Sequence, residues 1–534
     1  MAISRRSFLR GVSAVGLAAV PGLAAACGDD DEPAPSTPAQ GEPTGAATPS
    51  ATAATRRGPS SGTLRLAEPF LASSLDADAG SSAAYNLQSI GVAECLARFT
   101  PTLAVEPWIA ARFDRVDDLT WKITLRDDVT FWDGSPVDAA AVRDSLLRTM
   151  EKQPGTADRL PPGTEFTASG YELTLKTPKP VGLLPTHLAD ASFAIKKVLP
   201  GNQLLYTGPW RVTAFTARES ATLEAYDNYR GGPPWIRTIQ ARQVADTNTR
   251  SLAVQAGDVD IAQALLPADV ERLKAAGLTV YVSPWARQHM IVLNVAAPPF
   301  NDLAVRKAFS LALDREAMAK GIMDGAATPA YGFAPDSVGH KGILAIQKFD
   351  AAEARRVLDA AGWLPGADGI RQKDGKKLSF KIATYAGRAE LEQAAVVAVD
   401  MLKAVGMEAS IEKVPDIEKT MSENSFQAAT YSIGSAGFGD LSRILGLLYV
   451  PSSRNKDRYS NPAVNQAYAE YLETSDEARR HVLLESIQQQ LGNDVPVVYL
   501  FNPKQVVATS RNVQNFSPHP NDAYRLHPDI RLGG

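Results

Sequence analysis

The sequence has 534 residues, of which 45% are hydrophobic and 21% charged, a composition typical of globular protein. The formal net charge is −4, and an acidic balance argues against a nucleic-acid partner or an anionic membrane surface. The length predicts two or three domains. Beyond the N-terminal signal described next, no uncharged apolar run reaches the roughly 18 residues that would indicate a membrane span.

A targeting signal stands at the N-terminus. Arg5 and Arg6 form a twin-arginine export motif followed by Phe8, and an apolar run extends from Gly11 to Ala26. The run is shorter than the roughly 20 residues that a membrane-spanning helix needs. We therefore predict a cleaved twin-arginine signal peptide over residues 1–27, with an uncleaved anchor helix as the alternative.

The apolar run stops at Cys27. Residues 23–27, Leu-Ala-Ala-Ala-Cys, resemble a bacterial lipobox. The resemblance implies that the Cys27 thiol receives a diacylglyceryl group and tethers the chain outside the cytoplasmic membrane. The second cysteine, Cys95, then has no intramolecular partner, so we expect no disulfide and a buried thiol on a helix over residues 85–96.

A linker over residues 28–61 follows the lipobox. It opens with acidic residues and continues in Pro, Ala, Thr, Ser and Gly, without Leu, Ile, Val, Met or an aromatic residue. Such a segment cannot bury enough apolar surface to offset its chain entropy, so we predict disorder. Its end matches Gly-x-Ser-x-Gly over residues 58–62, but the strand-turn-helix context of a nucleophile elbow is missing.

The globular body alternates strand and helix patterns. Thr120–Arg126 alternates apolar and polar residues, which predicts a half-buried strand. A helix is expected over Ala139–Met150, with Asp138 as its N-cap. Asp302 is expected to cap a further helix that presents Phe309 to a core.

The second half of the body carries a β-α-β pattern. Strands are expected around residues 378–382 and 407–411, separated by a helix over about 389–404. Such a unit predicts a parallel pair joined by a right-handed crossover. Another amphipathic helix is expected over Ala351–Ala361, closed by Gly362.

Four separated stretches, in this order, carry a resemblance that covers most of the body. They are Leu125–Pro136 with its Asp-Gly turn, Thr207–Ile261 beginning Thr-Gly-Pro-Trp, Leu293–Arg315, and the helix end Ala360–Trp363. In these stretches the chain resembles the extracytoplasmic solute-binding proteins of ABC importers, family 5, the dipeptide, oligopeptide and nickel-binding type. Trp132 and Ala141 depart from the pattern of that family.

The resemblance implies an α/β fold of the periplasmic-binding-protein kind, with two lobes, a hinge and an extra subdomain in lobe one. Lobe one would comprise residues 62–287 and 495–534, and lobe two residues 288–494. Because proline cannot donate to a strand ladder, Pro496 suits the start of a returning strand at 495–500. Solute bound between the lobes would favour closure, since it contacts both lobes only in the closed state.

The resemblance also directs attention to the ligand cleft. Peptide-binding relatives carry an aspartate for the peptide ammonium in a loop that matches residues 431–440, where this chain has Gly437 or a neighbour, unless Asp440 substitutes. Strand C-terminal ends are where open α/β sheets bind ligands. The predicted ligand contacts are Tyr85 and Asn86 from lobe one, and Tyr385, Arg388, Phe438 and Asp440 from lobe two.

The function predicted is that of a lipid-anchored, monomeric receptor, not an enzyme, which captures a peptide-like or chelated-metal solute and delivers it to an ABC permease. No cofactor or protein-held metal is expected, because there is no His-Glu-x-x-His and the six histidines are scattered. Two alternatives stay open. One is a binding module for a membrane sensor, and the other is a secreted hydrolase with a serine or histidine site.

Overall fold

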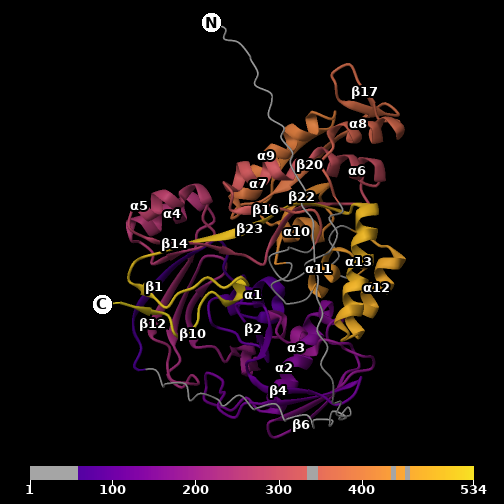
Figure 1. Ribbon diagram of the computed structural model, residues 1–534. Coiled ribbons are helices and arrows are strands. Elements are labelled where there is room, and N and C mark those ends of the chain that lie inside the picture. The colour runs from indigo at the N-terminus through magenta and orange to yellow at the C-terminus, as the bar shows by residue number, and fades with distance from the viewer. Residues whose placement is uncertain (1–57, 334–346, 435–440, 452–457, 534) are drawn as a thin grey trace, which may run out of the picture. The chain divides into compact units, whose positions relative to one another are not determined.

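The computed structural model describes residues 58–333, 347–434, 441–451 and 458–533. Its organising element is β23 (Val497–Thr509), a strand of 13 residues that is buried along most of its length. The first half of β23 pairs with β15 (Gln288–Leu293), and the second half pairs with β14 (Thr279–Pro284) and β13 (Ile261–Ala262). Figure 1 shows β14 and β23 side by side. One strand therefore belongs to the sheets of both lobes.

The sheet of the first lobe runs β10-β11-β12-β1-β13-β23, and its β1–β12 pair is parallel. Apolar residues of β1, β11 and β12 face a core that also receives α1 (Ser81–Ser89). The other bounds are β1 (Ser61–Glu68), β10 (Trp210–Thr216), β11 (Ser220–Ala225), β12 (Ile236–Gln243), α4 (Thr247–Ala256) and α5 (Val270–Ala275).

A subdomain with its own core is inserted between β1 and β10. Its antiparallel sheet, in the order β4-β5-β7-β6, packs on α2 (Ala139–Lys152), and Asp138 caps that helix as expected. The bounds here are β4 (Ala110–Arg115), β5 (Thr120–Leu125), β6 (Glu165–Ser169) and β7 (Glu172–Lys176), with small elements β2 (Ala97–Phe99), β3 (Val105–Pro107), α3 (Leu184–His187), β8 (Lys197–Val198) and β9 (Leu204–Leu205).

The sheet of the second lobe runs β23-β15-β22-β20-β21. The predicted β-α-β unit is confirmed: β20 (Ser379–Thr384) and β21 (Glu408–Lys413) pair in parallel, and α9 (Ala389–Lys403) connects them. β22 (Ala428–Ile433) pairs in parallel with β20 on its other side. Gly406 has φ +87°, a left-handed conformation that favours glycine and lets the chain turn from α9 into β21.

Helices cover the second lobe. Asp302 caps α6 (Leu303–Ala312) as predicted, and Phe309 is buried. The other bounds are α7 (Arg315–Met323), β16 (Ala327–Pro329), α8 (Ala351–Ala360), β17 (Leu364–Pro365), β18 (Arg371–Lys373), β19 (Lys376–Lys377), α10 (Ile417–Ser422), α11 (Ser442–Leu448), α12 (Pro462–Glu473), α13 (Glu477–Asp494), and, near the C-terminus in the first lobe, β24 (Val513–Gln514) and β25 (Arg531–Leu532).

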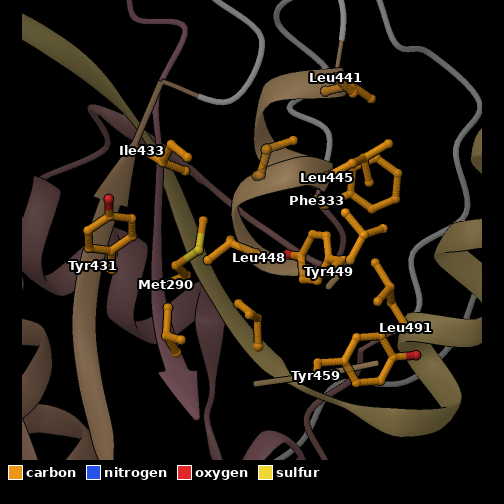
Figure 2. Close-up of a cluster of buried hydrophobic side chains, with 14 of the residues drawn as sticks. Met290, Phe333, Tyr431, Ile433, Leu441, Leu445, Leu448, Tyr449, Tyr459 and Leu491 are labelled. Atoms are coloured by element: carbon orange, nitrogen blue, oxygen red, sulfur yellow. The ribbon is translucent and has the colours of Figure 1, made fainter. Parts of the chain in front are cut away.

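One apolar cluster fixes the end of β22. Figure 2 shows Leu445 and Leu448 of α11 beside Met290, with Tyr431 and Ile433 of β22 on the other side of it. Met290 and Tyr431 are register partners on neighbouring strands. The packing therefore holds Ile433, the last residue of β22, in place.

One local expectation is wrong, and the bounds of another differ. The helix expected over residues 85–96 ends at Ser89, because the chain turns at Gly91, which has φ +76° and packs against the Trp210 ring. Cys95 is therefore not helical, although it is buried and free as expected. The strand expected at 495–500 is present, but it begins after Pro496 and runs on to Thr509, and its first half lies in the second-lobe sheet.

Within the described ranges, no helix has the length and apolar character needed to cross a membrane. The predicted signal with Arg5, Arg6 and Cys27 lies outside the described residues.

Candidate ligand cleft between the lobes

A cavity of about 790 Å³ is lined by residues of both lobes. The first lobe contributes the segment after β1, one face of α1 and the end of β12. The second lobe contributes the segments after β20 and β21 and the end of β22. Between them stands Arg287, in the crossover from β14 to β15.

Strand ends place these residues together. The pairs β1–β12, β20–β21 and β20–β22 are all parallel, so their carboxyl ends lie at the same edge within each sheet. Phe70 and Gln243 stand at the first-lobe edge, while Tyr385, Val414 and Ile433 stand at the second-lobe edge. The cavity is therefore at the position where open α/β sheets bind ligands.

Four of the six predicted ligand contacts line this cavity. Phe438 and Asp440 lie outside the described residues, as does Gly437, so the loop that matches the ammonium-binding segment has no structural account. The four that line the cavity are Tyr85 and Asn86 on α1, Tyr385 after β20, and Arg388 at the N-cap of α9.

Sequence reasoning missed most of the charge in the cavity. Lys413 ends β21 and Asp416 follows it, so the strand-end argument that selected Tyr385 could have found them. Arg287 and Arg525 carry no local signal, because only tertiary folding brings the crossover and the C-terminal tail to the cavity. The missed basic residues are Arg218, Arg287, Lys413, Arg443, Arg458 and Arg525.

Most of the missed arginines already have acidic or carbonyl partners. Arg287 donates to Asp522 at 3.1 Å and to the Ser432 carbonyl at 3.2 Å, and so connects the C-terminal tail with β22. Arg525 pairs with Glu68 and, at 3.2 Å, with Asp522. Arg525 thus pairs with both buried carboxylates, and Arg287 pairs with Asp522 alone.

Arg388 differs from these arginines. It is only 3% exposed, yet its guanidinium makes no hydrogen bond or ion pair with any described residue. Its central carbon lies 4.8 Å from the ring centroid of Trp285 and 5.3 Å from that of Phe70. Burial, followed by the nearby Arg287 charge, lowers the pKa of Arg388 to about 9, so the group stays charged at neutral pH. An oxyanion in the cavity would provide the missing partner.

Two carboxylates also line the cavity. Asp416 caps α10 and pairs with Arg218 of the β10–β11 turn at 3.0 Å, a contact between the lobes. Burial raises the pKa of Asp416, but the Lys419 amide and Arg218 outweigh it and hold the pKa below its usual value. Glu418 accepts a hydrogen bond from the Tyr431 hydroxyl at 2.7 Å.

A buried pair supports the start of α9. His289 Nε2 lies 3.0 Å from Glu390 Oε1, and both side chains are buried. Burial lowers the pKa of His289, so the ring is neutral and donates its Nε2 proton to the carboxylate. Burial opposes the ionisation of Glu390, but His289 and Arg388 outweigh it and lower its pKa to about 2. Glu390 therefore stays ionised two residues from Arg388.

The described cavity gives no support to the hydrolase alternative. None of the described residues that line it is a histidine. Ser60 of the Gly-x-Ser-x-Gly match precedes β1 and hydrogen-bonds the Pro234 carbonyl, so it is not on a strand-to-helix turn. The described part of the chain also holds no group of three or more His, Cys, Asp or Glu residues arranged to bind a metal ion.

The fold and the cavity define a class of protein. Two α/β lobes are joined by two crossing segments, β14–β15 and β23, and the cavity lies at their facing strand ends. This is the architecture of two-lobed extracytoplasmic binding proteins, which close around a solute.

The comparisons with known proteins specify the family. Residues 104–456 match the bacterial extracellular solute-binding proteins, family 5. Protein XP55 of Streptomyces lividans is 30% identical over 76% of this chain and 77% of its own length. The glutathione-binding protein GsiB of Pectobacterium atrosepticum is 26% identical over 76% of this chain and 82% of its own length.

A solved structure agrees. NikA of Staphylococcus aureus in complex with Ni(L-His)2 superposes with a TM-score of 0.81 at 24% identity, covering 88% of this chain and 99% of that chain. This chain belongs to the family 5 extracellular solute-binding proteins. The expected fold class, two-lobed α/β with a hinge, is thereby confirmed.

Proposed function

We propose that this chain is the solute receptor of an ABC importer, exported through its twin-arginine signal and anchored by lipid at Cys27. It captures a peptide-like or chelated-metal solute between its lobes and delivers it to the permease. Family membership supports the receptor role, and relatives named for glutathione and nickel support these two solute classes.

The observation that carries the proposal is the cavity itself. Its volume of about 790 Å³ lies within the roughly 300–1,000 Å³ of small-molecule sites. That space suits a di- or tripeptide or a small chelate. Both lobes supply its walls, so a bound solute would contact both, as closure on a ligand requires.

The predicted contacts have separate roles in this proposal. Arg388 binds a carboxylate of the solute, because its buried guanidinium has no hydrogen-bond partner among the described residues. Tyr85 and Tyr385 offer aromatic contact area, and Asn86 offers an amide from α1. Phe438 and Asp440 remain proposed contacts, with Asp440 as the candidate for an ammonium group.

A metal would arrive with its own chelator. The described residues hold no cluster of metal-binding side chains, so the protein would recognise the organic part of a chelate. The carboxylates of such a chelate are partners for an arginine, as is the C-terminus of a peptide.

Lobe boundaries follow the same proposal, with residues 62–287 and 495–534 in lobe one and 288–494 in lobe two. The structure qualifies the boundary at residue 495, because β23 pairs with strands of both lobes. The Arg218–Asp416 pair joins the lobes, as expected for a closed state.

The first test identifies the solute. Mass spectrometry of small molecules that co-purify with the protein should detect a carboxylate compound of peptide or chelate type. Thermal unfolding with dipeptides, glutathione and nickel with L-histidine should then show stabilisation, about 2.7 kcal/mol at 100 times the Kd. No co-purifying molecule and no shift at millimolar concentration with any probe would contradict the proposal.

The second test concerns export and anchoring. Arg5→Lys with Arg6→Lys should retain the chain in the cytoplasm, and Cys27→Ser should release it from the membrane fraction. Export that survives the paired lysine substitutions would overturn the twin-arginine assignment.

A further inference from the structure

The guanidinium of Arg388 is held by aromatic rings and not by polar partners. Arg250, an equally buried arginine of the first lobe, donates five hydrogen bonds. Arg388 donates none to any described residue and instead lies over Trp285 and Phe70. Its orientation therefore depends on these two rings, through cation–π attraction and packing.

The two rings come from different parts of the fold. Trp285 is in the crossover between β14 and β15 and is buried, so it lies beside the hinge. Phe70 follows β1 in the first lobe, whereas Arg388 is in the second lobe. The Phe70–Arg388 contact therefore joins the lobes and depends on their closure.

Phe70 approaches residue 387 so closely that glycine fits there and a larger residue does not. Gly387 has φ +97°, and a Cβ atom on it would lie 2.6 Å from Phe70 Cζ. The ring of Phe70 also faces Tyr385, with 6.4 Å between centroids. The Phe70 ring thus packs against the backbone of the loop that carries Arg388. A side chain at residue 387 would displace this ring.

The consequence concerns solute recognition. We propose that Phe70 is a positioning residue that holds the Arg388 guanidinium in the closed state and makes recognition of the carboxylate conditional on closure. This inference rests on the proposed function, in which Arg388 binds that carboxylate. When the lobes open, Arg388 loses one ring, water reaches it, and its attraction for an anion falls. Binding of the carboxylate and closure of the lobes then favour each other.

The test compares each solute with its own amide. Wild-type protein and the variants Phe70→Leu, Phe70→Trp and Arg388→Gln are titrated calorimetrically with alanyl-alanine, alanyl-phenylalanine, glutathione and nickel with L-histidine, and with the carboxamide forms. We expect wild type to prefer the acid, Phe70→Leu to lose roughly tenfold of that preference, and Phe70→Trp to keep it. On the Arg388→Gln background, Phe70→Leu should not change the acid-to-amide ratio any further.

The ratio separates positioning from packing. A packing role for Phe70 would lower acid and amide affinity by the same factor, and would add to the effect of Arg388→Gln. Either result overturns the inference while the proposed function stands. Failure of wild type to bind any probe overturns the proposed function, and the inference with it.

A matched control is available in Leu447. It lines the same cavity and is a partly buried residue packed on the same core as Phe70. As an aliphatic residue, it cannot make the cation–π contact that Phe70 makes with Arg388. Leu447→Ala should leave the acid-to-amide ratio unchanged, and a change as large as that of Phe70→Leu would overturn the inference.

Discussion

Two buried arginines of the second lobe show how differently the fold treats the same side chain. Arg315, at the start of α7, is fully buried and donates five hydrogen bonds, including one to the Tyr499 carbonyl of β23 and one to Gln347. Arg388 is 3% exposed and donates none to any described residue.

This difference in hydrogen bonding distinguishes Arg315, which stabilises the fold, from Arg388, which we propose binds the solute. Leaving a buried charge without polar partners costs free energy, so such a group in a cavity is a candidate ligand contact. Arg315 finds its hydrogen-bond partners within the chain and binds the first half of β23. Arg388 lines the cavity, where the function that we propose gives it a solute carboxylate as its partner.

The largest loss of stability is expected when Arg315, the arginine with hydrogen-bond partners inside the fold, is replaced. Arg315→Met leaves several buried acceptors without donors and should lower the free energy of unfolding by about 3–5 kcal/mol. Arg388→Met removes a buried charge without hydrogen-bond partners but also part of the attraction that lowers the Glu390 pKa, so stability should change by less than about 1 kcal/mol. Urea denaturation of both variants checks this, and equal losses would refute the distinction.

The next largest loss of stability is expected in acid, where Glu390, two residues from Arg388, becomes protonated. Glu390 has a pKa lowered to about 2 from an ordinary 4.5, so its contribution is full above pH 4.5 and is lost as the pH falls towards 2. That shift corresponds to a stability loss on the order of 3 kcal/mol. The lowered pKa of His289 acts in the same direction, because only the unfolded chain takes up a proton just below pH 6.5.

Urea denaturation between pH 7 and pH 3 measures this loss. Glu390→Gln keeps an acceptor for His289 and removes the titrating carboxyl, so the slope below pH 4.5 should become smaller. An unchanged slope in this variant would show that other carboxyls dominate.

Gly387→Ala tests the surroundings of Arg388, because residue 387 lies against the Phe70 ring. The added methyl group meets the Phe70 ring at a backbone position with φ +97°, which strains a residue with a side chain. We expect a cost of about 1–3 kcal/mol, part of it paid only on closure, and hence weaker solute binding. Small-angle scattering with and without solute should show less compaction than wild type. Full compaction at wild-type affinity would count against a close approach of Phe70.

The smallest effect is expected at the interlobe pair Arg218–Asp416. The Arg218 side chain is 57% exposed, so solvent screens the pair. Arg218→Gln should weaken solute affinity by less than about 1 kcal/mol, and the difference should disappear in high salt. Calorimetric titration at two salt concentrations tests this. An effect that persists in high salt would assign Arg218 a direct contact with the solute.

The sequence by itself determined the local structure, because local chemistry decides it. Asp138 and Asp302 were recognisable as N-caps, since a carboxylate before an amphipathic run satisfies free amide groups. The alternating patterns around α9 predicted its parallel strands. They also placed Tyr385 and Arg388 at strand ends, although their role as ligand contacts remains a proposal. The family was likewise legible in short motifs, whereas the export signal read from such a motif remains a proposal.

Only the tertiary structure decided how β23 serves both lobes and which charges are compensated. No local pattern shows that residues 497–501 pair with β15 and 504–509 with β14. Nor does the sequence around Arg388 indicate that Phe70, more than three hundred positions earlier, covers its guanidinium. Such contacts depend on long-range packing, which brings distant segments together only after each has formed its own local structure.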